Sequence, residues 1–345
     1  MRFAIVGCGY ISRVHLTSIK KIKNAEAVAV VDKDKKKAEE RAAEFGIPRI
    51  YTNWQEAFKS KDVDAAIICL PHKLHYACVM DALNAGKHVF VEKPISIASK
   101  EAADMIESAK EKELTLMAGH MKRFDRRFVV MKEKIDAGAI GKVFLAKSEW
   151  IGPKEIFKNN PWAADPAQGG GPLMGFGSHH IDLLHWLIGP IKCISCYTNN
   201  LVLPKVEVED SAVAILEFEN GAIGNLIYSW GAEIYGQDEN MVIHGTEGTL
   251  KLENEKLYYT SEKTYKDRTP RLLETKRSDG KDIQEFGKEL ALSSLEPFTR
   301  ELEHFIDCIE TKRKPLTGGE EAEKAVDVII KAYQSAAEKS SRSLQ

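Results

Sequence analysis

The sequence predicts an α/β protein in which a doubly wound parallel sheet is followed by a second domain. Three observations predict this: short apolar runs alternate with helical patterns in the first third, a glycine turn follows the first run, and alternating strands begin after about residue 121. We expect two domains, residues 1–121 and 122–345, which suits a chain of 345 residues.

The apolar runs of the first domain are continuous, which is typical of parallel strands covered by helices on both faces. Right-handed crossovers between such strands give a doubly wound sheet. The expected strands are 3–6, 27–31, 65–70, 88–91 and 115–118, and the expected helices are 35–45, 76–85 and 101–111.

The segment Gly7-Cys8-Gly9-Tyr10-Ile11-Ser12 joins the first strand to a helix in a G-x-G-x-x-S pattern. Gly7 suits a tight turn, and Gly9 lets a pyrophosphate approach the backbone at the helix N-terminus. Asp32 ends the second strand 23 residues after Gly9, a spacing that suits an acid bound to the adenosine ribose. The alternative for Asp32 is a cap on the next helix.

We expect NAD as the cofactor, because an acid at Asp32 repels the 2'-phosphate of NADP. Lys33 follows directly and offsets part of this repulsion, so NADP is also possible. Tighter binding of NADP than of NAD by the purified protein would overturn the preference.

The run Val89-Phe90-Val91-Glu92-Lys93-Pro94 is a buried-strand pattern that ends in a Lys-Pro pair. The carboxyl ends of parallel strands line the crevice where ligands bind. A lysine there can hold or move a proton on a substrate oxygen. Taken alone, the segment is more typical of a surface lysine in a loop. Together with the surrounding motifs, it favours a lysine at the ligand-binding edge of the sheet.

The second domain is predicted to be α+β, with a large open, mostly antiparallel sheet, because several of its strands alternate apolar and polar residues. Asn220-Gly221 predicts a hairpin turn between two of them. The expected strands are 142–150, 211–218, 222–230, 241–244 and 249–252, helices are expected at 297–311 and 320–338, and the polar stretch 253–288 predicts an edge or a loop.

Three glycines, 169–171, lead toward a helix that Ser178 could cap. In its first turn, His179 shares a face with Asp182 at i+3. The positive end of the helix dipole favours the neutral imidazole, which can accept a proton, although packing or capping is an equal alternative. The histidines here lack H-E-x-x-H spacing and a separate third ligand, so we expect no metal.

Composition excludes several classes of function. Acidic and basic residues nearly balance at 51 and 49, which argues against nucleic-acid and membrane-surface partners. No apolar stretch approaches the roughly 20 residues that span a bilayer. A strand begins at Phe3, without room for a signal sequence. Six cysteines lie mostly among apolar neighbours and are expected to be reduced, so we expect a soluble, cytoplasmic protein.

Together these motifs resemble the glucose–fructose oxidoreductase, inositol dehydrogenase and rhizopine-catabolism (Gfo/Idh/MocA) family over essentially the whole chain. The order of the motifs is more specific than any one of them. The resemblance is carried by the glycine turn with His15, by 70–75, by 85–89 leading into Glu92-Lys93-Pro94, by Arg123-Phe124-Asp125, by Trp162 and Asp165-Pro166, by the triple glycine, and by 244–250.

The resemblance implies a Rossmann domain followed by an open-sheet domain whose exposed face forms homodimers or homotetramers. It implies that Lys93 hydrogen-bonds the reacting hydroxyl and the ribose, and that His179 is the general acid or base. The expected cofactor-binding residues are Gly7, Gly9, Tyr10, Ile11, Asp32, Lys33, Pro71, His75, Glu92 and Lys93, and the expected substrate-binding residues are Arg123, Trp162, Asp165 and Asp182.

The chain departs from the family pattern at one position. The family's D-x-G-x-H segment reads G-x-G-x-H here, with Gly175 in place of the aspartate. Either His179 works without that carboxylate, Asp182 or His180 substitutes for it, or the substrate contributes its own groups.

These expectations predict an NAD(P)-dependent oxidoreductase that transfers a hydride between the cofactor and a secondary alcohol or ketone of a sugar, cyclitol or sugar derivative. Two alternatives stay open. One is a regulator that binds NAD(P) and a protein partner without turnover. The other is an enzyme that keeps its cofactor bound through a cycle of oxidation and reduction.

Overall fold

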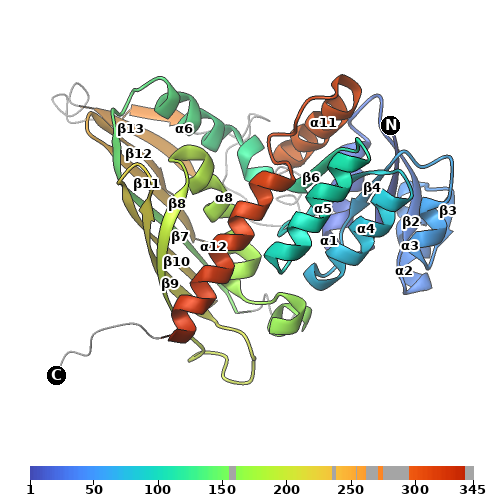
Figure 1. Cartoon of the computed structure of the whole chain (residues 1–345), viewed down its shortest axis with the longest axis horizontal. Helices are drawn as coiled ribbons and strands as arrows, with labels where there is room; N and C mark the ends of the chain where they lie inside the picture. Colours follow the sequence, from blue (N-terminus) through green and yellow to red (C-terminus); the bar gives the residue numbers. More distant parts are fainter. Residues whose placement is uncertain (155–160, 235–237, 254, 262–270, 275–294, 339–345) are drawn as a thin grey trace. The chain divides into compact units, whose positions relative to one another are not determined.

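The computed structural model describes residues 1–154, 161–234, 238–253, 255–261, 271–274 and 295–338 (Figure 1). The chain divides into two compact units. The first comprises Met1–Phe124 with the described part of 287–326, and the second comprises the described parts of 125–286 and 327–345.

The first unit contains a six-stranded parallel sheet in the order β3-β2-β1-β4-β5-β6. The strand order reverses between β1 and β4, which is the position at which doubly wound sheets bind ligands. The predicted α/β class and parallel sheet are therefore confirmed. The strands are β1 (Arg2–Val6), β2 (Glu26–Val31), β3 (Arg49–Tyr51), β4 (Ala65–Ile68), β5 (His88–Glu92) and β6 (Leu116–Gly119).

Helices connect these strands near the expected positions. Asp34 caps α2 by accepting hydrogen bonds from the backbone N–H groups of Lys36 and Lys37, and Gly46 ends it at a φ of 73°. β3 and α3 were not predicted, because elements of three and five residues show no clear periodicity. The helices are α1 (Tyr10–Ile19), α2 (Lys35–Phe45), α3 (Trp54–Phe58), α4 (His75–Asn84) and α5 (Ser99–Glu111), with short 3₁₀ turns η1 (His72–Leu74) and η2 (Met121–Phe124).

Helix α11 (Leu295–Thr311) corrects the expected domain division. We predicted that 122–345 forms one second domain, but α11 belongs to the first unit. Its apolar stripe, Leu302, Phe305 and Ile306, is buried in the same core as Phe3 and Phe90. A contiguous division fails here because the core of the parallel sheet needs an apolar cover that a later part of the sequence supplies.

The second unit contains an eight-stranded sheet in the order β14-β13-β12-β11-β7-β10-β9-β8. β10 pairs parallel with β7 and every other pairing is antiparallel, which confirms the open, mostly antiparallel sheet. The strands are β7 (Val143–Pro153), β8 (Ile191–Asn199), β9 (Ser211–Phe218), β10 (Ile223–Ala232), β11 (Asp238–Gly245), β12 (Gly248–Glu253), β13 (Lys256–Ser261) and β14 (Arg271–Glu274). Apart from β13 and β14, the stretch 253–288 lies largely outside the described residues.

Alternation along β9 separates the two faces of this sheet. Ala214 and Leu216 are buried, whereas Val213 and Ile215 are exposed. Gly221, with a φ of 85°, makes the predicted hairpin turn between β9 and β10. Figure 1 places α6 and α8 against one face. The helices of this unit are α6 (Arg126–Asp136), α8 (Ser178–Leu187) and the second half of α12 (Gly319–Glu338).

The predicted cap at Ser178 is wrong. A π-helical turn, η5 (Leu173–Gly177), runs directly into α8, so Ser178 is already helical. Its hydroxyl donates to the carbonyl of Gly175 at 3.1 Å rather than to an N–H group. His179 therefore lies one turn inside a longer helical segment, and the dipole argument for its neutral form loses most of its force.

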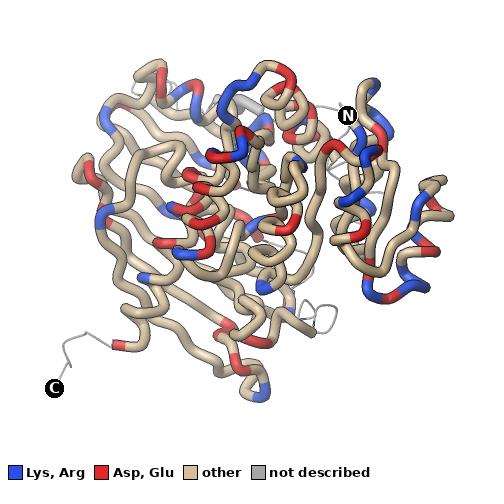
Figure 2. The backbone as a smooth tube through the Cα atoms, turned by 45° about the vertical axis from the view of Figure 1, so that its right-hand side comes forward, with Lys and Arg blue, Asp and Glu red and all other residues tan. Residues whose placement is uncertain are grey.

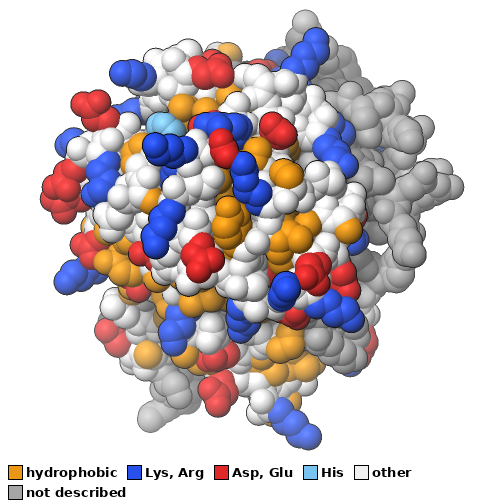
Figure 3. All heavy atoms as spheres, turned by 90° about the vertical axis from the view of Figure 1, so that its right-hand side faces the viewer, with side chains coloured by type: hydrophobic (Ala, Val, Ile, Leu, Met, Phe, Trp, Pro, Cys, Tyr) orange, Lys and Arg blue, Asp and Glu red, His pale blue; other side chains and the backbone are white. Residues whose placement is uncertain are grey.

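The distribution of surface charge and the state of the cysteines agree with what the amino-acid composition predicts. Acidic and basic residues are interspersed along the backbone and on the face that includes much of the first unit (Figures 2 and 3). All six cysteines are free thiols, five of them buried. Among the described residues, no helix combines the length and apolar character that crossing a membrane requires.

One carboxyl group in the core of the first unit is unusual. Glu301 of α11 is fully buried, and within the described residues neither of its oxygens has a hydrogen-bond partner. Burial raises its pKa well above the ordinary value, and the nearby charge of Glu92 raises it further. The side chain thus keeps its proton in the folded protein at pH values where the unfolded chain has lost it.

We expect Glu301→Gln to stabilise the protein increasingly as pH rises. Above the unfolded pKa of about 4.5, the folded state holds a proton that the unfolded state releases, so wild-type stability falls with pH. The amide has no such proton. Thermal unfolding at pH 5 and pH 8 should give a larger gain in melting temperature at pH 8.

Glu303→Gln, at an exposed position on the same helix, is the matched control and should change little at either pH. An equal gain for Glu301→Gln at both pH values would show that Glu301 ionises normally in the fold.

Candidate active site

The glycine turn after β1 has the geometry that its sequence predicts. Gly7 has a φ of 95°, and a Cβ atom there would lie 2.4 Å from the carbonyl oxygen of Cys69. At Gly9, no heavy atom of the described residues lies within 4 Å of the equivalent position. Helix α1 begins at Tyr10 without a side-chain cap, so no capping side chain occupies the N–H groups of its first turn. This is a ready site for an anionic group.

Asp32 lies at the end of β2, beside this turn. Its carboxylate accepts hydrogen bonds from the N–H groups of Cys8 and Asp34, both at 2.9 Å. The cap on α2 is Asp34 instead. Lys33 and Tyr10 are exposed and Ile11 is half-buried, so each can reach a ligand at this edge of the sheet.

Lys93 follows the end of β5, two strands from β1 in the sheet order. The preceding Glu92 is buried, and its Oε1 lies 2.7 Å from Nε2 of His15 on α1. Burial acts to raise the pKa of Glu92, but the hydrogen bond and charge of His15, with Lys93, hold it below its usual value. A carboxylate is thus kept beside Lys93.

Burial lowers the pKa of Lys93, although Glu92 opposes the shift and Lys122 adds to it. A lysine with a lowered pKa gives up and recovers a proton more readily than one in water. This property suits a group that exchanges a proton with a substrate oxygen.

His75 lies between two loops of the same edge, with a carbonyl oxygen of each beside one of its ring nitrogens. Its Nδ1 lies 2.8 Å from the carbonyl oxygen of Pro94, and its Nε2 lies 2.9 Å from that of Leu70. The ring is fully buried, and burial lowers its pKa. His75 therefore connects the loop after β4, which contains the half-buried Pro71, to the loop after β5. Its position supports the shape of the edge rather than direct contact with a ligand.

In the second unit, His179 lies next to an aromatic cluster. Its ring centroid is 6.4 Å from that of Phe176. Phe176 stacks on Trp150 at 4.0 Å and meets Trp230 edge-on at 5.7 Å. Trp150 and Trp230 are buried, so both serve as core residues behind Phe176. The cluster fixes the start of the helix that carries His179.

The aromatic cluster also gives a physical reason for glycine at 175. A Cβ atom on Gly175 would lie 2.7 Å from Cη2 of Trp230, closer than real contacts allow. An aspartate there would collide with the indole ring. The unexpected glycine and the buried tryptophan therefore form a matched pair.

His180 and Asp182 are both buried on α8. The ring of His180 is held on both sides, with Nδ1 at 2.8 Å from the hydroxyl of Ser148 and Nε2 at 2.6 Å from Glu239. These contacts give His180 a structural role in linking α8 to β7 and β11. Of the two substitutes considered for the missing aspartate, His180 is therefore engaged in other contacts.

The remaining predicted substrate residues fall in both units. Arg123, buried in the first unit, donates to the carbonyl of Leu316 at 3.0 Å and pairs with Glu321 at 3.4 Å. These contacts hold the guanidinium group near the start of α12. In the second unit, the half-buried Asp165 caps a 3₁₀ turn through the N–H of Ala167, and Trp162 is half-buried in the turn before it.

Sequence reasoning missed Arg41 and Glu209. The helical spacing of Arg41 from Ala38 and Ala42 is a sequence signal that could have found it, because the three residues form the buried face of α2. Glu209 accepts hydrogen bonds from the N–H of Leu173 at 3.0 Å and from Tyr333 at 2.9 Å. Burial raises its pKa to about 7. No local pattern marks Glu209, because both partners are distant in sequence.

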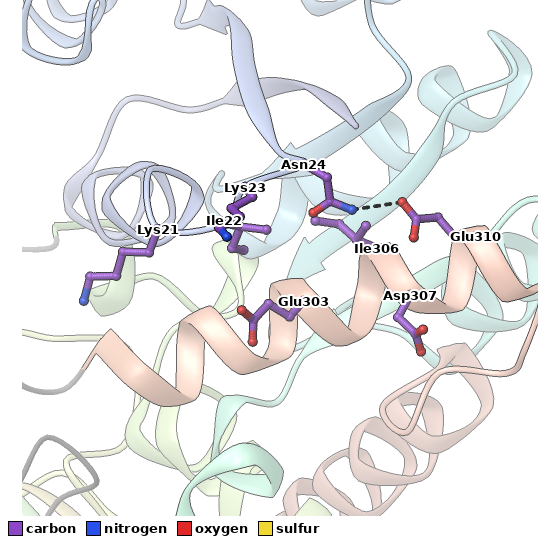
Figure 4. A pocket seen from close by; sticks show the side chains of 8 residues that line it. All are labelled: Lys21, Ile22, Lys23, Asn24, Glu303, Ile306, Asp307 and Glu310. Carbon is purple, nitrogen blue, oxygen red and sulfur yellow. Dashed lines mark hydrogen bonds between the residues drawn. The ribbon is translucent and has the colours of Figure 1, made fainter.

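A pocket of about 380 Å³ in the first unit lies away from this chemistry (Figure 4). Lys21, Ile22, Lys23 and Asn24 line it from the loop before β2, and residues of α11 line the other side. It therefore opens at the amino end of β2, opposite to the edge that carries Gly9 and Lys93. Within the described parts of the chain, no group of three or more histidine, cysteine, aspartate or glutamate side chains could hold a metal ion.

Comparison with known proteins identifies both parts of the chain. Residues 1–120 match the model of the oxidoreductase family with an NAD-binding Rossmann fold, and residues 128–251 match the GFO/IDH/MocA C-terminal domain. Myo-inositol 2-dehydrogenase of Thermotoga maritima is 27% identical, over 100% of this chain and 99% of its own length. The NAD⁺-dependent scyllo-inositol 2-dehydrogenase of Bacillus subtilis is 28% identical, over 97% and 94%.

The fold is also similar to solved structures. Levoglucosan dehydrogenase in complex with NADH and levoglucosan aligns with a TM-score of 0.87 at 21% identity, over 99% of this chain and 98% of that one. The glycine turn, with its open helix N-terminus, fits the NAD that the family binds. The chain therefore belongs to the Gfo/Idh/MocA family of NAD-binding oxidoreductases.

Proposed function

We propose that this protein is an NAD-dependent dehydrogenase or reductase acting on a secondary alcohol or ketone of a sugar, cyclitol or sugar derivative. The observation that carries the proposal is the carboxyl edge of the parallel sheet. It combines an open helix N-terminus at Gly9 with a lysine of lowered pKa at Lys93. The names of the inositol and levoglucosan dehydrogenases support the substrate class. The free thiols are compatible with a cytoplasmic protein.

In the proposed roles, the N–H groups of Gly9, Tyr10 and Ile11 bind the pyrophosphate, and Asp32 accepts from the adenosine ribose. Lys33, Pro71, His75 and Glu92 shape the rest of the cofactor site. NAD, when bound, supplies the hydride acceptor. Arg123, Trp162, Asp165 and Asp182 remain the proposed substrate-binding residues.

Two side chains carry out the proposed proton transfer. His179 takes the proton of the substrate hydroxyl as a general base during oxidation. Lys93 stabilises the developing alkoxide through its ammonium group and relays the proton. In the reverse direction His179 returns the single proton to the substrate oxygen as hydride arrives at the carbon, and Lys93 again stabilises the charge on that oxygen.

The decisive assay is formation of reduced cofactor from NAD, and separately from NADP, over cyclitols, aldoses, sugar acids and nucleotide sugars. Turnover with any member supports the proposal. Binding of NAD without turnover across the panel would favour a regulator. Cofactor that stays bound through purification would indicate an enzyme that recycles it in place.

We expect Gly9→Val to weaken NAD binding by at least about tenfold, because its side chain fills the space over the first turn of α1. The φ of Gly9 is −73°, which valine also adopts, so the fold should persist. Calorimetric titration with NAD measures the loss. Thr17→Val on the same helix is the control and should bind normally. Unchanged affinity in Gly9→Val would remove the pyrophosphate from this turn.

We expect Lys93→Ala and His179→Ala each to lower turnover by about 10²–10⁴-fold, the usual contribution of a general acid or base. The control is Lys87→Met, at the opposite end of β5, where the ammonium group donates to the carbonyls of Ser60 and Val63. It should keep its rate. Steady-state kinetics at saturating NAD test all three, and wild-type rates in both alanine variants would reject these roles.

We also propose that the exposed face of the eight-stranded sheet forms a homo-oligomer. Strand register places apolar side chains of neighbouring strands side by side on this face, because directly paired residues point the same way. Tyr197 pairs with Val213, and Ile223 pairs with Leu145. Ile215, 63% exposed, lies on the same face. An exposed apolar surface that continues across neighbouring strands favours association with a second copy of the chain.

We expect Ile215→Glu to dissociate the oligomer, because it places a charge in an apolar interface. Light scattering after size-exclusion chromatography measures the mass. Leu201→Glu is the control, since Leu201 is 81% exposed but lies outside the strands. A monomeric wild type, or an unchanged mass in Ile215→Glu, would contradict this assembly.

A further inference from the structure

Arg41 is a buried arginine with no role in the proposed chemistry. It lies on α2, on the face that packs against the sheet, and only 9% of its surface is exposed. Its Nη2 donates to the carbonyl oxygens of Cys8 and Gly9, both at 3.1 Å. A guanidinium group thus contacts two successive peptides of the glycine turn from within the protein.

These bonds determine where the other side of each peptide points. In a planar trans peptide, the C=O and the following N–H point in opposite directions. The carbonyl of Cys8 shares its peptide with the N–H of Gly9, and the carbonyl of Gly9 shares its peptide with the N–H of Tyr10. Since Arg41 holds both carbonyls on the protein side, both N–H groups are directed away from Arg41, toward the open side of the turn.

Further hydrogen bonds also hold the glycine turn and the side chain of Arg41 in place. The N–H of Cys8 donates to Asp32 at 2.9 Å, and the carbonyl of Gly9 also accepts from the hydroxyl of Ser12 at 2.7 Å. Glu44 accepts from Nη1 of Arg41 at 2.5 Å and fixes the guanidinium plane. The turn is therefore held in one conformation before any ligand binds.

We propose that Arg41 is a positioning residue for the cofactor pyrophosphate, which it serves by holding the N–H groups of Gly9 and Tyr10 toward the phosphates. This inference rests on the proposed assignment of the glycine turn to the pyrophosphate. Arg41 acts through the backbone and by its buried positive charge rather than by contact with the cofactor. Preorganised donors bind more tightly because they lose less conformational freedom on binding.

Arg13 offers a matched comparison. It lies on α1 and pairs with the same Glu44, with Nε at 2.8 Å from Oε1. Its side chain is exposed, and no hydrogen bond joins it to the turn carbonyls in the described structure. Removing Arg13 deletes a nearby positive charge without releasing the turn.

The experiment compares three ligands in Arg41→Met and Arg13→Met by titration followed by NMR. NAD and ADP-ribose contain the pyrophosphate, and adenosine lacks it. We expect Arg41→Met to weaken NAD and ADP-ribose by about tenfold, the order of one charged hydrogen bond, and to leave adenosine unchanged. Arg13→Met should bind all three normally.

Arg41→Lys keeps the folded protein testable if the methionine variant is unstable. Lysine retains the charge but lacks the fork that reaches two carbonyls, so its affinity for ADP-ribose should fall between wild type and Arg41→Met. Equal weakening of adenosine and ADP-ribose, or no weakening of either, would overturn the inference. Normal NAD binding by Gly9→Val would instead remove the assignment on which it rests.

Discussion

The hydrogen bond between Glu92 and His15 joins two segments of the first unit, the strand that leads to Lys93 and the helix that follows the glycine turn. Glu92 ends the strand that leads to Lys93, and His15 lies on the helix that begins at the glycine turn. Both groups are buried, so the pairing gives the Glu92 carboxylate and Nε2 of His15 a partner whose loss would destabilise the core. The glycine turn and the lysine after β5 are therefore held together through this pair.

Helix α11 makes that buried polar pair possible. Its Phe298 meets the ring of His15 edge-on at 5.8 Å, and its Phe305 meets Phe90 at the same centroid distance. Glu301 follows Phe298 by about one helical turn. It lies close enough to Glu92 for the charge of that residue to raise the pKa of Glu301. A segment more than 200 residues beyond either partner in sequence thus excludes water from the pair and strengthens its electrostatic interactions.

The second unit prepares its own catalytic candidate by apolar packing. Phe176, stacked on Trp150 and edge-on to Trp230, fixes the turn that leads to His179, and Gly175 leaves room for the ring of Trp230. Where the family pattern has a carboxylate, this chain has an indole. His179 consequently lies beside the aromatic cluster, with its ring centroid 6.4 Å from that of Phe176.

The sequence by itself determined the class of the fold, the order of its major strands and helices, the glycine turn and the lysine at the end of β5. These features depend on local periodicity and on residues whose backbone or chemistry admits few alternatives, such as Gly7 at a φ of 95°. Tertiary structure alone decided that α11 covers the first sheet, that Trp230 occupies the space at Gly175, and that Arg41 reaches the turn carbonyls. Each of these depends on contacts between residues far apart in the chain, and local patterns do not encode such distances.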